Sequence, residues 1–447
     1  MQENDINLQA KAAKFISELR YEALPLEIVE DAKYRVLDWL GSALSGIHYQ
    51  PSLIITGLVK ATGGAAQATV LKGNAKVPVA QAAFANGIIG HVAEFDDGHR
   101  LAIAHPGAVT VPAALAIAEG YNKSGKELLT AIVAGYEVLI RLGMAINPSH
   151  YRIWHATGTC GGFAAAASAS SLLHLNQRGT QMALGIAGTM ASGLQETFGT
   201  HAKPLNAGHA CQSGIQAALL AQQGFTGPED ILLGDKGFIK ATAIDYNTKV
   251  LEEIGESPLL ASTAFYKVYA SCGHTNSPLD AVFKIVEKHD IPLQFIRRIQ
   301  VGTYRIAVEL TGQLKNNSED EAKFSLPYCL AVALMHKKVT LKEFSPDKLN
   351  DPAILEIAKK IEVVEDQAAT SAFPKRRATI RIELGNNRII EESVNTSNDT
   401  PQYDALEEKF LSLAADCFDR PTAQRIRDVI LDIEKLDNLN ALMRYLG

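Results

Sequence analysis

Residues 86–109, NGIIGHVAEFDDGHRLAIAHPGAV, hold six titratable side chains among neighbours that are mostly Ala, Gly, Val and Leu. The six are three imidazoles and three carboxylates: His91, Glu94, Asp96, Asp97, His99 and His105. An imidazole moves protons near neutral pH, and a carboxylate beside it can fix its orientation. One interpretation is therefore a helix that ends in a site loop, where acids orient the imidazoles and Pro106 fixes His105.

The same stretch could instead bind a divalent metal ion, because spaced His and Asp side chains are common metal ligands. The sequence has no HExxH pairing, and the neighbours Asp96 and Asp97 must direct their side chains differently. We therefore predict no metal site. His91, Asp96 and His99 are expected to be structural or to face solvent.

A single lysine stands in a long apolar region. Between residues 153 and 228 the formally charged residues are Arg178, Glu196 and Lys203. A buried lysine is costly unless an anion pairs with it. The segment FGTHAKPLNAGHA therefore predicts a lysine that binds an anion or donates a proton, or else a solvated loop in which Lys203 has no function.

A histidine directly precedes a glycine-rich stretch in YRIWHATGTCGGFAAAA, residues 151–167. We expect a helix to begin after the glycines, and amides at such an N-terminus bind carboxylate or phosphate. His155 could then deliver a proton to the bound anion. In the alternative interpretation the glycines only permit tight helix crossing, and His155 is a hydrogen-bonded core residue.

Lys267, Tyr269, Cys272 and His274 cluster in YKVYASCGHTNSPLDA. Cys272 could be a nucleophile with His274, but residues two apart rarely face each other and cysteine is often simply buried. The sequence has no GxSxG motif, Walker loop or GxGxxG in a βαβ pattern. Acyl-serine hydrolysis, nucleotide triphosphate use and dinucleotide binding therefore lack support.

Composition indicates a soluble globular protein rich in small residues. The residues are 47% hydrophobic, 21% charged and 7% aromatic. The length of 447 residues exceeds what one hydrophobic core normally organises and therefore favours two domains. The formal net charge of -6, without any basic run, argues against nucleic-acid and membrane-surface partners. The charge-free run 101–118 contains Pro106 and Pro112, which interrupt a membrane-spanning helix.

The cysteines and the N-terminus predict a cytoplasmic location. Five widely spaced cysteines without a CxxC pair favour reduced thiols over a disulfide framework or a structural zinc site. The polar, acid-containing start MQENDINLQAK resembles neither a secretory signal nor an Arg-rich transit peptide.

Apolar spacing predicts a helical first part, without strands, up to about residue 260. The predicted helical segments are 5–25, 25–46, 109–119, 125–146, 162–173, 180–193 and 207–224. Beyond about residue 265, FIRRIQVGTYRIAVEL and RRATIRIELGNNRIIEESV alternate as strands do, with helices expected at 278–288 and 321–336. We expect a helical domain at 1–264, an α+β lid at 265–400, and C-terminal helices at 401–447 that pack on the first domain.

A series of segments resembles, in order, the MmgE/PrpD family. These segments are NGIIGHVAEFDDGHRLAIAHPGAVTVPAALAIAE, AGYEVLIRLG, WHATGTCGGFAAAA, ALGIAGTMASGLQE, AKPLNAGHA and LLAQQGFTGPEDIL. The resemblance spans most of the chain and is weaker after residue 290, where EAKFSLPYCLAVAL and LEEKFLSLA still match. The family includes 2-methylcitrate dehydratase, cis-aconitate decarboxylase and iminodisuccinate epimerase.

The resemblance implies a cofactor-independent homodimer with a large helical domain, a smaller α+β lid and an active site between them. Carried over by motif, the catalytic residues are His105, His155 and Lys203. The residues expected to bind the substrate are Glu94, Asp97, Thr157, Lys267, Tyr269 and His274. Two departures from the family pattern concern specificity: Glu94 stands where the family has Asp, and the region after Cys272 reads Gly-His-Thr-Asn.

The expected reaction makes or protonates a carbanion beside a carboxylate, for which aimed cations and a nearby acid lower the barrier. The leading hypothesis is a lyase of a small tri- or dicarboxylate, with decarboxylation of cis-aconitate preferred over dehydration of 2-methylcitrate. The next alternative is an epimerase of an amino-dicarboxylate such as iminodisuccinate. Two further classes stay open: a metal-dependent hydrolase that uses the His/Asp stretch, and a non-catalytic helical scaffold.

Overall fold

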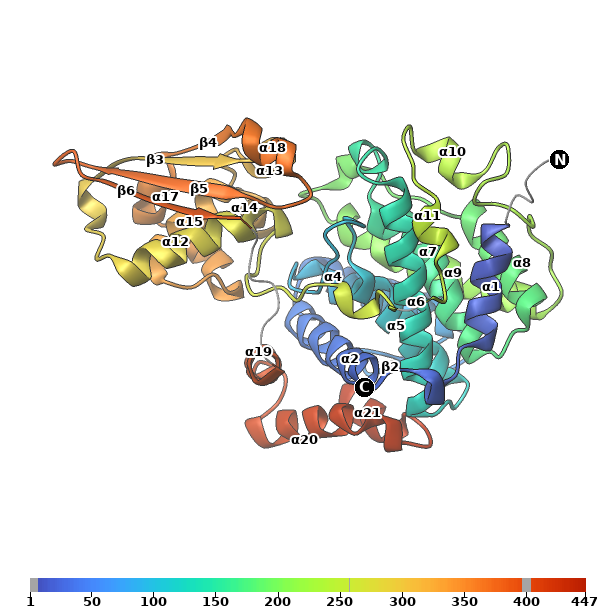
Figure 1. Ribbon diagram of the computed structural model, residues 1–447. Coiled ribbons are helices and arrows are strands. Elements are labelled where there is room, and N and C mark those ends of the chain that lie inside the picture. The colour runs from blue at the N-terminus through green and yellow to red at the C-terminus, as the bar shows by residue number, and fades with distance from the viewer. Residues whose placement is uncertain (1–6, 257, 396–402) are drawn as a thin grey trace. The chain divides into compact units, whose positions relative to one another are not determined.

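The computed structural model describes residues 7–256, 258–395 and 403–447 (Figure 1). The chain divides into two compact units, which are described separately. Unit 1 comprises residues 1–266 and 402–447, and unit 2 comprises residues 267–401. Unit 1 is almost entirely helical, whereas unit 2 combines a sheet with helices, so the prediction of a mainly helical protein with an α+β portion is confirmed.

The helices of unit 1 enclose a core of small side chains. They are α1 (Leu8–Glu18), α2 (Leu26–Gly46), α3 (Gln50–Thr62), α4 (Val79–Val92), α5 (Pro106–Gly120), α6 (Gly125–Ile146), α7 (Ala156–Leu172), α8 (Gln177–Thr189), α9 (Ala202–Gln222), α10 (Phe238–Thr242), α11 (Lys249–Glu252), α19 (Tyr403–Ala414), α20 (Arg420–Leu431) and α21 (Asn440–Leu446). Almost all of α7 is buried, and it packs against α5, α6, α8 and α9.

Glycine lets these helices approach closely. A Cβ at Gly135 in α6 would lie 2.3 Å from the Ser168 hydroxyl in α7, and one at Gly214 in α9 would lie 2.5 Å from the Gly162 carbonyl oxygen. Real side chains do not tolerate such distances. The interpretation of the glycines as permitting tight helix crossing is therefore supported at these crossings.

The glycine-rich stretch lies inside α7 and not ahead of it, so the predicted start at residue 162 is wrong. The helix begins at Ala156, with His155 as its N-cap residue. Gly161 has a packing role within the helix, because a Cβ there would meet Val109 at 2.9 Å and Ala210 at 3.1 Å. The sequence does not show that the glycines lie within the helix, because their packing role depends on neighbours distant in sequence.

The expectation that the first 260 residues contain no strand is also wrong, although by little. Strands β1 (Ala68–Val70) and β2 (Ala75–Val77) form an antiparallel hairpin. Lys72 and Asn74 in its turn have φ of 52° and 48°. Strands of three residues are too short to show an alternating pattern.

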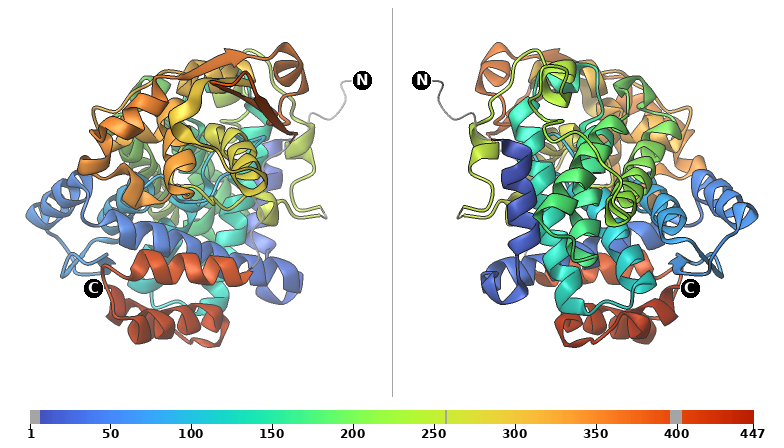
Figure 2. Two further views of the ribbon diagram at one scale, coloured as in Figure 1. Left: turned by 90° about the vertical axis from the view of Figure 1, so that its left-hand side faces the viewer. Right: turned by 90° about the vertical axis from the view of Figure 1, so that its right-hand side faces the viewer.

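The C-terminal helices belong to unit 1, as predicted. Helix α19 packs along α2, where the Tyr34 and Tyr403 rings stack at 4.0 Å. Lys409 of α19 forms an ion pair with the buried Asp38 of α2 at 2.7 Å. Both views in Figure 2 show the C-terminal helices, in red, beside the blue α2.

Unit 2 is built on a four-stranded sheet of order β4-β3-β5-β6. Its strands are β3 (Ile296–Thr303), β4 (Ile361–Glu365), β5 (Ala378–Leu384) and β6 (Ile389–Val394). Strand β3 pairs parallel with β4 and antiparallel with β5, and β5 pairs antiparallel with β6. The hairpin predicted at GNN is confirmed: Asn387 in the turn has a φ of 61°. Ile380 and Ile382 face the core, as the alternation requires.

Helices cover one face of this sheet (Figure 1). They are α12 (Asn276–Lys288), α15 (Leu326–His336) and α17 (Pro352–Ala358). The shorter helices of the unit are α13 (Arg305–Thr311), α14 (Glu319–Lys323), α16 (Pro346–Leu349) and α18 (Gln367–Ala372). The predicted strand at 295–310 is wrong in its second half, which forms α13 and buries Ala307 and Thr311. The helix predicted at 321–336 is broken at Ser325, which caps α15 by accepting from the Tyr328 amide.

One helix among the described residues is long and apolar enough to cross a membrane by composition alone. It is α6, and 94% of its apolar window is buried inside the protein. This burial is typical of a core helix, since a membrane span would present its apolar surface to lipid. The charge-free run 101–118 lies largely in α5, which is also buried.

Candidate active site

Three helix N-termini converge on one cluster in unit 1, and each carries one of the predicted catalytic residues. His105 is the N-cap of α5, His155 is the N-cap of α7, and Lys203 lies in the first turn of α9. The last turn of α4 adds His91, whose ring lies 4.9 Å from the His105 ring and 6.0 Å from the His155 ring. Helix N-termini carry partial positive charge, so the cluster suits an anionic ligand.

Lys203 is buried, which contradicts the alternative of a solvated loop. Its side chain is about 4% exposed and forms an ion pair with Glu94. The Lys203 Nζ also donates a hydrogen bond to His91 Nε2 at 3.0 Å and lies 5.6 Å from the centre of the Phe198 ring. The ammonium is therefore held among an acid, an imidazole and an aromatic face.

Glu94 reaches Lys203 from an unusual backbone conformation. It directly follows the end of α4, its amide donates to the His91 carbonyl at 3.2 Å, and its φ is 58°. A residue with a Cβ in this left-handed region costs about 1 kcal/mol or more relative to the right-handed region. The ion pair with Lys203 is a contact that this conformation makes possible. Direct binding of substrate by Glu94 stays a prediction.

His91 and Asp96 belong to the cluster, although the sequence interpretation left them outside it. Both side chains are fully buried, so the expectation that they could face solvent is wrong. His91 Nδ1 donates to Asp96 Oδ2 at 2.9 Å, which leaves Nε2 as the acceptor for Lys203. The position of His91 in the last turn of α4, facing α9, could have been inferred only by knowing that these two helices pack together.

His105 is oriented through its Nδ1 atom. This nitrogen lies 2.6 Å from the Asp97 carbonyl oxygen and 3.7 Å from Asp96 Oδ2. A carbonyl oxygen only accepts, so Nδ1 carries the hydrogen and Nε2 of the neutral ring is a lone-pair acceptor. The His105 amide donates to Thr157 Oγ1 at 3.1 Å, so Thr157 positions the start of α5. Its contact with substrate stays a prediction.

His155 is the most deeply buried of the predicted catalytic residues, about 1% exposed. Burial and the nearby cationic Lys203 lower the pKa of His155 well below its ordinary value, so the ring is neutral at pH 7. Its Nε2 atom is buried and has no hydrogen-bond partner among the residues that the structure describes. A buried orphan polar atom in a site is a mark of function, because structural histidines are normally satisfied.

Asp97 is held in place by three hydrogen-bond donors. Its carboxylate accepts hydrogen bonds from Arg35 at 3.2 Å, the Tyr136 hydroxyl at 2.7 Å and the Gly107 amide at 2.9 Å. Burial raises the pKa of Asp97 to about 6, while Arg35 and the hydrogen bonds act in the opposite direction. In this structure Asp97 holds the loop that carries His105, and its predicted contact with substrate stays a prediction.

His99 has a separate role in the same loop. Its Nδ1 accepts from the Ala102 amide at 3.0 Å, and its Nε2 lies 3.1 Å from the Thr263 hydroxyl. These contacts tie the loop to a distant segment of unit 1, so His99 is structural, as one of the two expectations had it.

Among the described residues, one group of side chains could hold a metal ion, as the metal alternative requires. Ligand atoms of His91, Asp96 and His105 lie within 4.8 Å of one another. However, His91 Nδ1 and Asp96 bond each other, the His105 Nδ1 bonds a carbonyl, and the Lys203 ammonium stands 3.0 Å from His91. A divalent cation there would replace these bonds beside an existing positive charge. The donor set therefore fits proton transfer better than metal binding.

Three of the predicted substrate-binding residues lie in unit 2. Lys267 is fully buried, the Tyr269 hydroxyl donates to Asp280 at 2.7 Å, and His274 Nδ1 lies 2.7 Å from the Tyr304 hydroxyl. Burial and Asp280 raise the pKa of Tyr269. The structure describes these residues within their own unit, so their contact with substrate stays a prediction.

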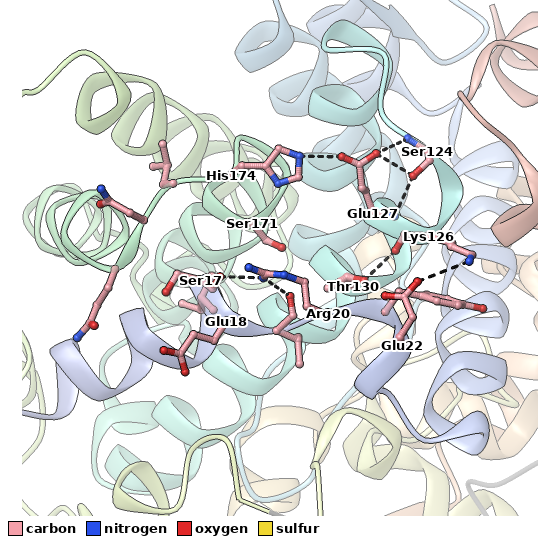
Figure 3. Close-up of a pocket in the computed structure, with 16 residues that line it drawn as sticks. Ser17, Glu18, Arg20, Glu22, Ser124, Lys126, Glu127, Thr130, Ser171 and His174 are labelled. Carbon is pink, nitrogen blue, oxygen red and sulfur yellow. Dashed lines mark hydrogen bonds and ion pairs between the residues drawn. The ribbon is translucent and has the colours of Figure 1, made fainter.

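A separate cavity of about 690 Å³ opens at the other end of α7 (Figure 3). Several polar side chains of the cavity wall bond to one another or to the backbone: Lys126 with Glu22, His174 with Glu127, and Arg20 with the Ser17 and Leu19 carbonyls. The cluster stands at residue 155 and this cavity at residue 171, about 24 Å apart along the helix axis. The cavity is roomy but contains none of the predicted catalytic residues.

The chain matches known protein families over most of its length. Residues 10–250 match the MmgE/PrpD N-terminal domain, and residues 269–435 match the MmgE/PrpD C-terminal domain. The first match includes all three predicted catalytic residues.

Several named proteins are similar to this chain. The cis-aconitate decarboxylase of Aspergillus terreus (strain NIH 2624 / FGSC A1156) is 26% identical over 98% of this chain and 95% of its own length. The cis-aconitate decarboxylase of Homo sapiens is 27% identical over 97% and 93% respectively. The mitochondrial 2-methylcitrate dehydratase of Yarrowia lipolytica (strain CLIB 122 / E 150) is 24% identical over 81% and 74%.

Proposed function

Because this chain belongs to the MmgE/PrpD family, we propose that it is a lyase of a small polycarboxylate that decarboxylates cis-aconitate to itaconate. Relatives with the name cis-aconitate decarboxylase, which align over nearly the whole chain, favour this reaction. The observation that carries the proposal is the convergence of Lys203, His105 and His155 at three helix N-termini.

The reaction needs a stabilised carbanion and a proton. When the carbon–carbon bond to the leaving carboxylate breaks, its electron pair forms the new terminal double bond and CO2 departs. The former double-bond pair moves to the carbon beside a retained carboxylate, where a proton completes itaconate. Cations aimed at that carboxylate lower the barrier, because negative charge spreads onto it in the transition state.

The side chains of the cluster suit these tasks. Lys203 would bind the carboxylate on which charge develops, exchanging its contact with Glu94 for one with the substrate. His155 would deliver the proton from its buried, unpartnered Nε2. The first turns of α5, α7 and α9 would bind the other carboxylates. All of these steps use protein groups alone.

Dehydration of 2-methylcitrate is the second candidate. It requires a base to remove a proton and an acid to protonate the leaving hydroxyl. The His105 ring offers an acceptor at Nε2, because its Nδ1 donates to Asp97. The similarity to a relative named 2-methylcitrate dehydratase favours this alternative as well.

The test is an assay of the purified full-length chain with each substrate. Incubation with cis-aconitate should yield itaconate in the NMR spectrum together with CO2, and Lys203→Ala should slow the formation of both about 1000-fold. Methylaconitate formed from 2-methylcitrate would redirect the proposal to dehydration. A product of unchanged mass from iminodisuccinate would redirect it to epimerisation, and activity lost with a chelator would redirect it to metal chemistry.

The assembly and compartment belong to the same proposal. We propose a homodimer, in line with the family resemblance, and sedimentation velocity should give twice the mass of the 48.2 kDa chain. A cytoplasmic location is supported by the five free cysteines, of which Cys160, Cys211, Cys272 and Cys329 are buried. Fractionation of the native host would test it.

A further inference from the structure

We propose that Asn206 is a positioning residue which locks His155 in the tautomer protonated on Nε2, so that His155 enters the reaction as a proton donor. The tautomer follows from a chain of four groups: the Leu194 carbonyl, the Thr197 hydroxyl, the Asn206 amide and the His155 ring. The donor role rests on the proposed lyase function, whereas the tautomer does not depend on it.

The chain begins at a group that can only accept. Thr197 Oγ1 donates its hydrogen to the Leu194 carbonyl oxygen at 2.7 Å. A hydroxyl has one hydrogen, so in its other contact Thr197 Oγ1 must act as an acceptor. The carbonyl of Leu194 thus fixes the direction of the next hydrogen bond.

The next contact fixes the orientation of the Asn206 amide. Asn206 Nδ2 lies 3.1 Å from Thr197 Oγ1 and 3.2 Å from His155 Nδ1. Oxygen and nitrogen of an amide are assigned from their hydrogen-bond network. Because Thr197 can only accept here, the amide must present its NH2 group. One hydrogen goes to Thr197 and the other to His155.

The last contact fixes the imidazole. His155 Nδ1 accepts from Asn206, so the single hydrogen of the neutral ring resides on Nε2. Four charged or titratable neighbours face the ring: Lys203 from α9, His91 from α4, and His105 and Glu94 from the intervening loop. Burial and the first three of these favour the neutral ring, and Glu94 opposes them. The Nε2–H group is left buried and unpartnered among the described residues, free to meet a substrate.

Two glycines hold Asn206 in place. A Cβ at Gly158 would lie 3.1 Å from Asn206 Cβ and 2.7 Å from the Ser192 carbonyl oxygen. A Cβ at Gly193, whose φ is 130°, would lie 3.3 Å from Asn206 Cγ. The His155 amide also donates to the Gly193 carbonyl at 3.0 Å. Three separate segments, WHATGT, ASGLQE and KPLNAGH, therefore meet at one packed junction that sets this hydrogen-bond chain.

The two site imidazoles then have opposite tautomers. His105 carries its hydrogen on Nδ1, where the Asp97 carbonyl accepts it, and His155 carries its hydrogen on Nε2. Neutral His155 can give a proton from Nε2 but cannot accept one there; the imidazolate that results faces the Lys203 ammonium and regains a proton from solvent after the product leaves. The geometry thereby assigns the direction of proton transfer, from His155 toward the substrate carbon.

The first test is spectroscopic and needs no substrate. The 15N shifts of labelled histidine distinguish a protonated from an unprotonated ring nitrogen, and His155→Gln identifies the signals of His155 by their loss. The wild-type protein at pH 7.5 should show protonated Nε2 and unprotonated Nδ1. Asn206→Asp supplies an acceptor instead of a donor and should place a hydrogen on Nδ1. A wild-type ring protonated on Nδ1, or signals unchanged in Asn206→Asp, would overturn the proposal.

The second test uses Thr197, which does not contact the ring. Thr197→Val removes the oxygen that orients Asn206 and should lower kcat about 100-fold with KM within a few-fold, as loss of a positioned acid does. Thr197→Ser keeps the oxygen and should recover most of the activity. Equal kcat values for the two variants would overturn the proposal. If the wild type is inactive on every polycarboxylate, the proposed function fails, and the 15N shifts still decide the tautomer.

Discussion

Helix α7 has a histidine at each end, and the two histidines differ in burial and in their hydrogen-bond partners. His155 at the N-terminus is about 1% exposed, neutral, and keeps a buried nitrogen without a partner among the described residues. His174 just beyond the C-terminus has a side chain 64% exposed, paired with Glu127 at 2.9 Å beside the 690 Å³ cavity. The 690 Å³ cavity thus lies beside the exposed histidine, which already has an acidic partner.

The difference separates two guides to a site, unsatisfied buried polarity at one end of the helix and cavity volume at the other, and the proposed function follows the first. Near the N-terminal end of α7 the titratable side chains are buried and contact one another. Burial strengthens the charge interactions between them. At the C-terminal end water screens the same kinds of group, and such pairs contribute little. Substitutions at the two ends should therefore have very unequal effects.

The largest expected effect is that of Lys203→Ala. Loss of the ammonium should lower kcat/KM about 1000-fold, because removal of a preorganised charge in a dry site costs about two to three orders of magnitude. Lys126→Ala, at the cavity end of α7, is the matched control and should stay within twofold. Steady-state assays on cis-aconitate measure both. Comparable losses for the two lysines would break the contrast between the ends of the helix.

His91 is expected to come second, through its contact with Lys203. His91→Gln can place a carbonyl oxygen near the position of Nε2, whereas His91→Asn is too short to reach Lys203 and retains only the contact with Asp96. We expect a loss of about 10-fold for Gln and about 100-fold for Asn, in the range of general acid–base contributions. Thermal unfolding of both variants controls for packing, and identical kinetics would refute the orienting role.

Asp97→Asn should have a smaller effect, because Asp97 acts through the loop that carries His105. The amide keeps the shape but weakens the contacts with Arg35 and the Gly107 amide. A fall of about 10-fold in kcat/KM is expected, as for an outer residue that orients a site group. The His105 signals in a 15N histidine spectrum should shift in this variant, and unaltered signals with lost activity would count against positioning.

Glu127→Gln, at the cavity end of α7, should change activity least. Its effect should instead appear in the pH dependence of stability. Hydrogen bonds from Ser124 and the charge of Lys123 lower the pKa of Glu127 to about 2, from 4.5 in a model peptide. The ionised form therefore stabilises the folded state above about pH 4.5, and this contribution disappears as pH falls through about 2. Melting curves of wild type and variant should differ at pH 7 and converge near pH 2, while kcat/KM stays the same.

The fold could be predicted where one periodicity extends over many residues. Helix α6 begins at Gly125 and ends at Ile146, the same bounds as its apolar spacing predicts, and Ser124 with Glu127 forms a capping box at its start. The alternation and the GNN turn predict the hairpin of β5 and β6 equally well. Predictions failed where a few residues decide the structure: the three-residue strands β1 and β2, the break at Ser325, and the glycines inside α7.

The site residues also differ in how clearly the sequence reveals them. Lys203 and His155 stand out in sequence, one as an isolated charge and the other beside glycines. Asn206 does not stand out, because an isolated polar residue on a helix is ordinary, and His91 is conspicuous only as one of six titratable residues. The contacts that matter for both cross between two segments of the fold. The family resemblance implies that Asp97 binds substrate, and its contact with Arg35, 62 positions away, becomes visible only in the fold.

The left-handed backbone of Glu94 has a consequence for the evolution and engineering of this chain. Glycine or asparagine would adopt a φ of 58° with less strain, so the residue that suits the backbone differs from the residue that contacts Lys203. Either replacement would, however, leave the buried Lys203 ammonium without its anion, and the cost of an unpaired buried charge exceeds the strain that is relieved. A laboratory selection for heat resistance should therefore retain the acid at position 94 in spite of its backbone conformation.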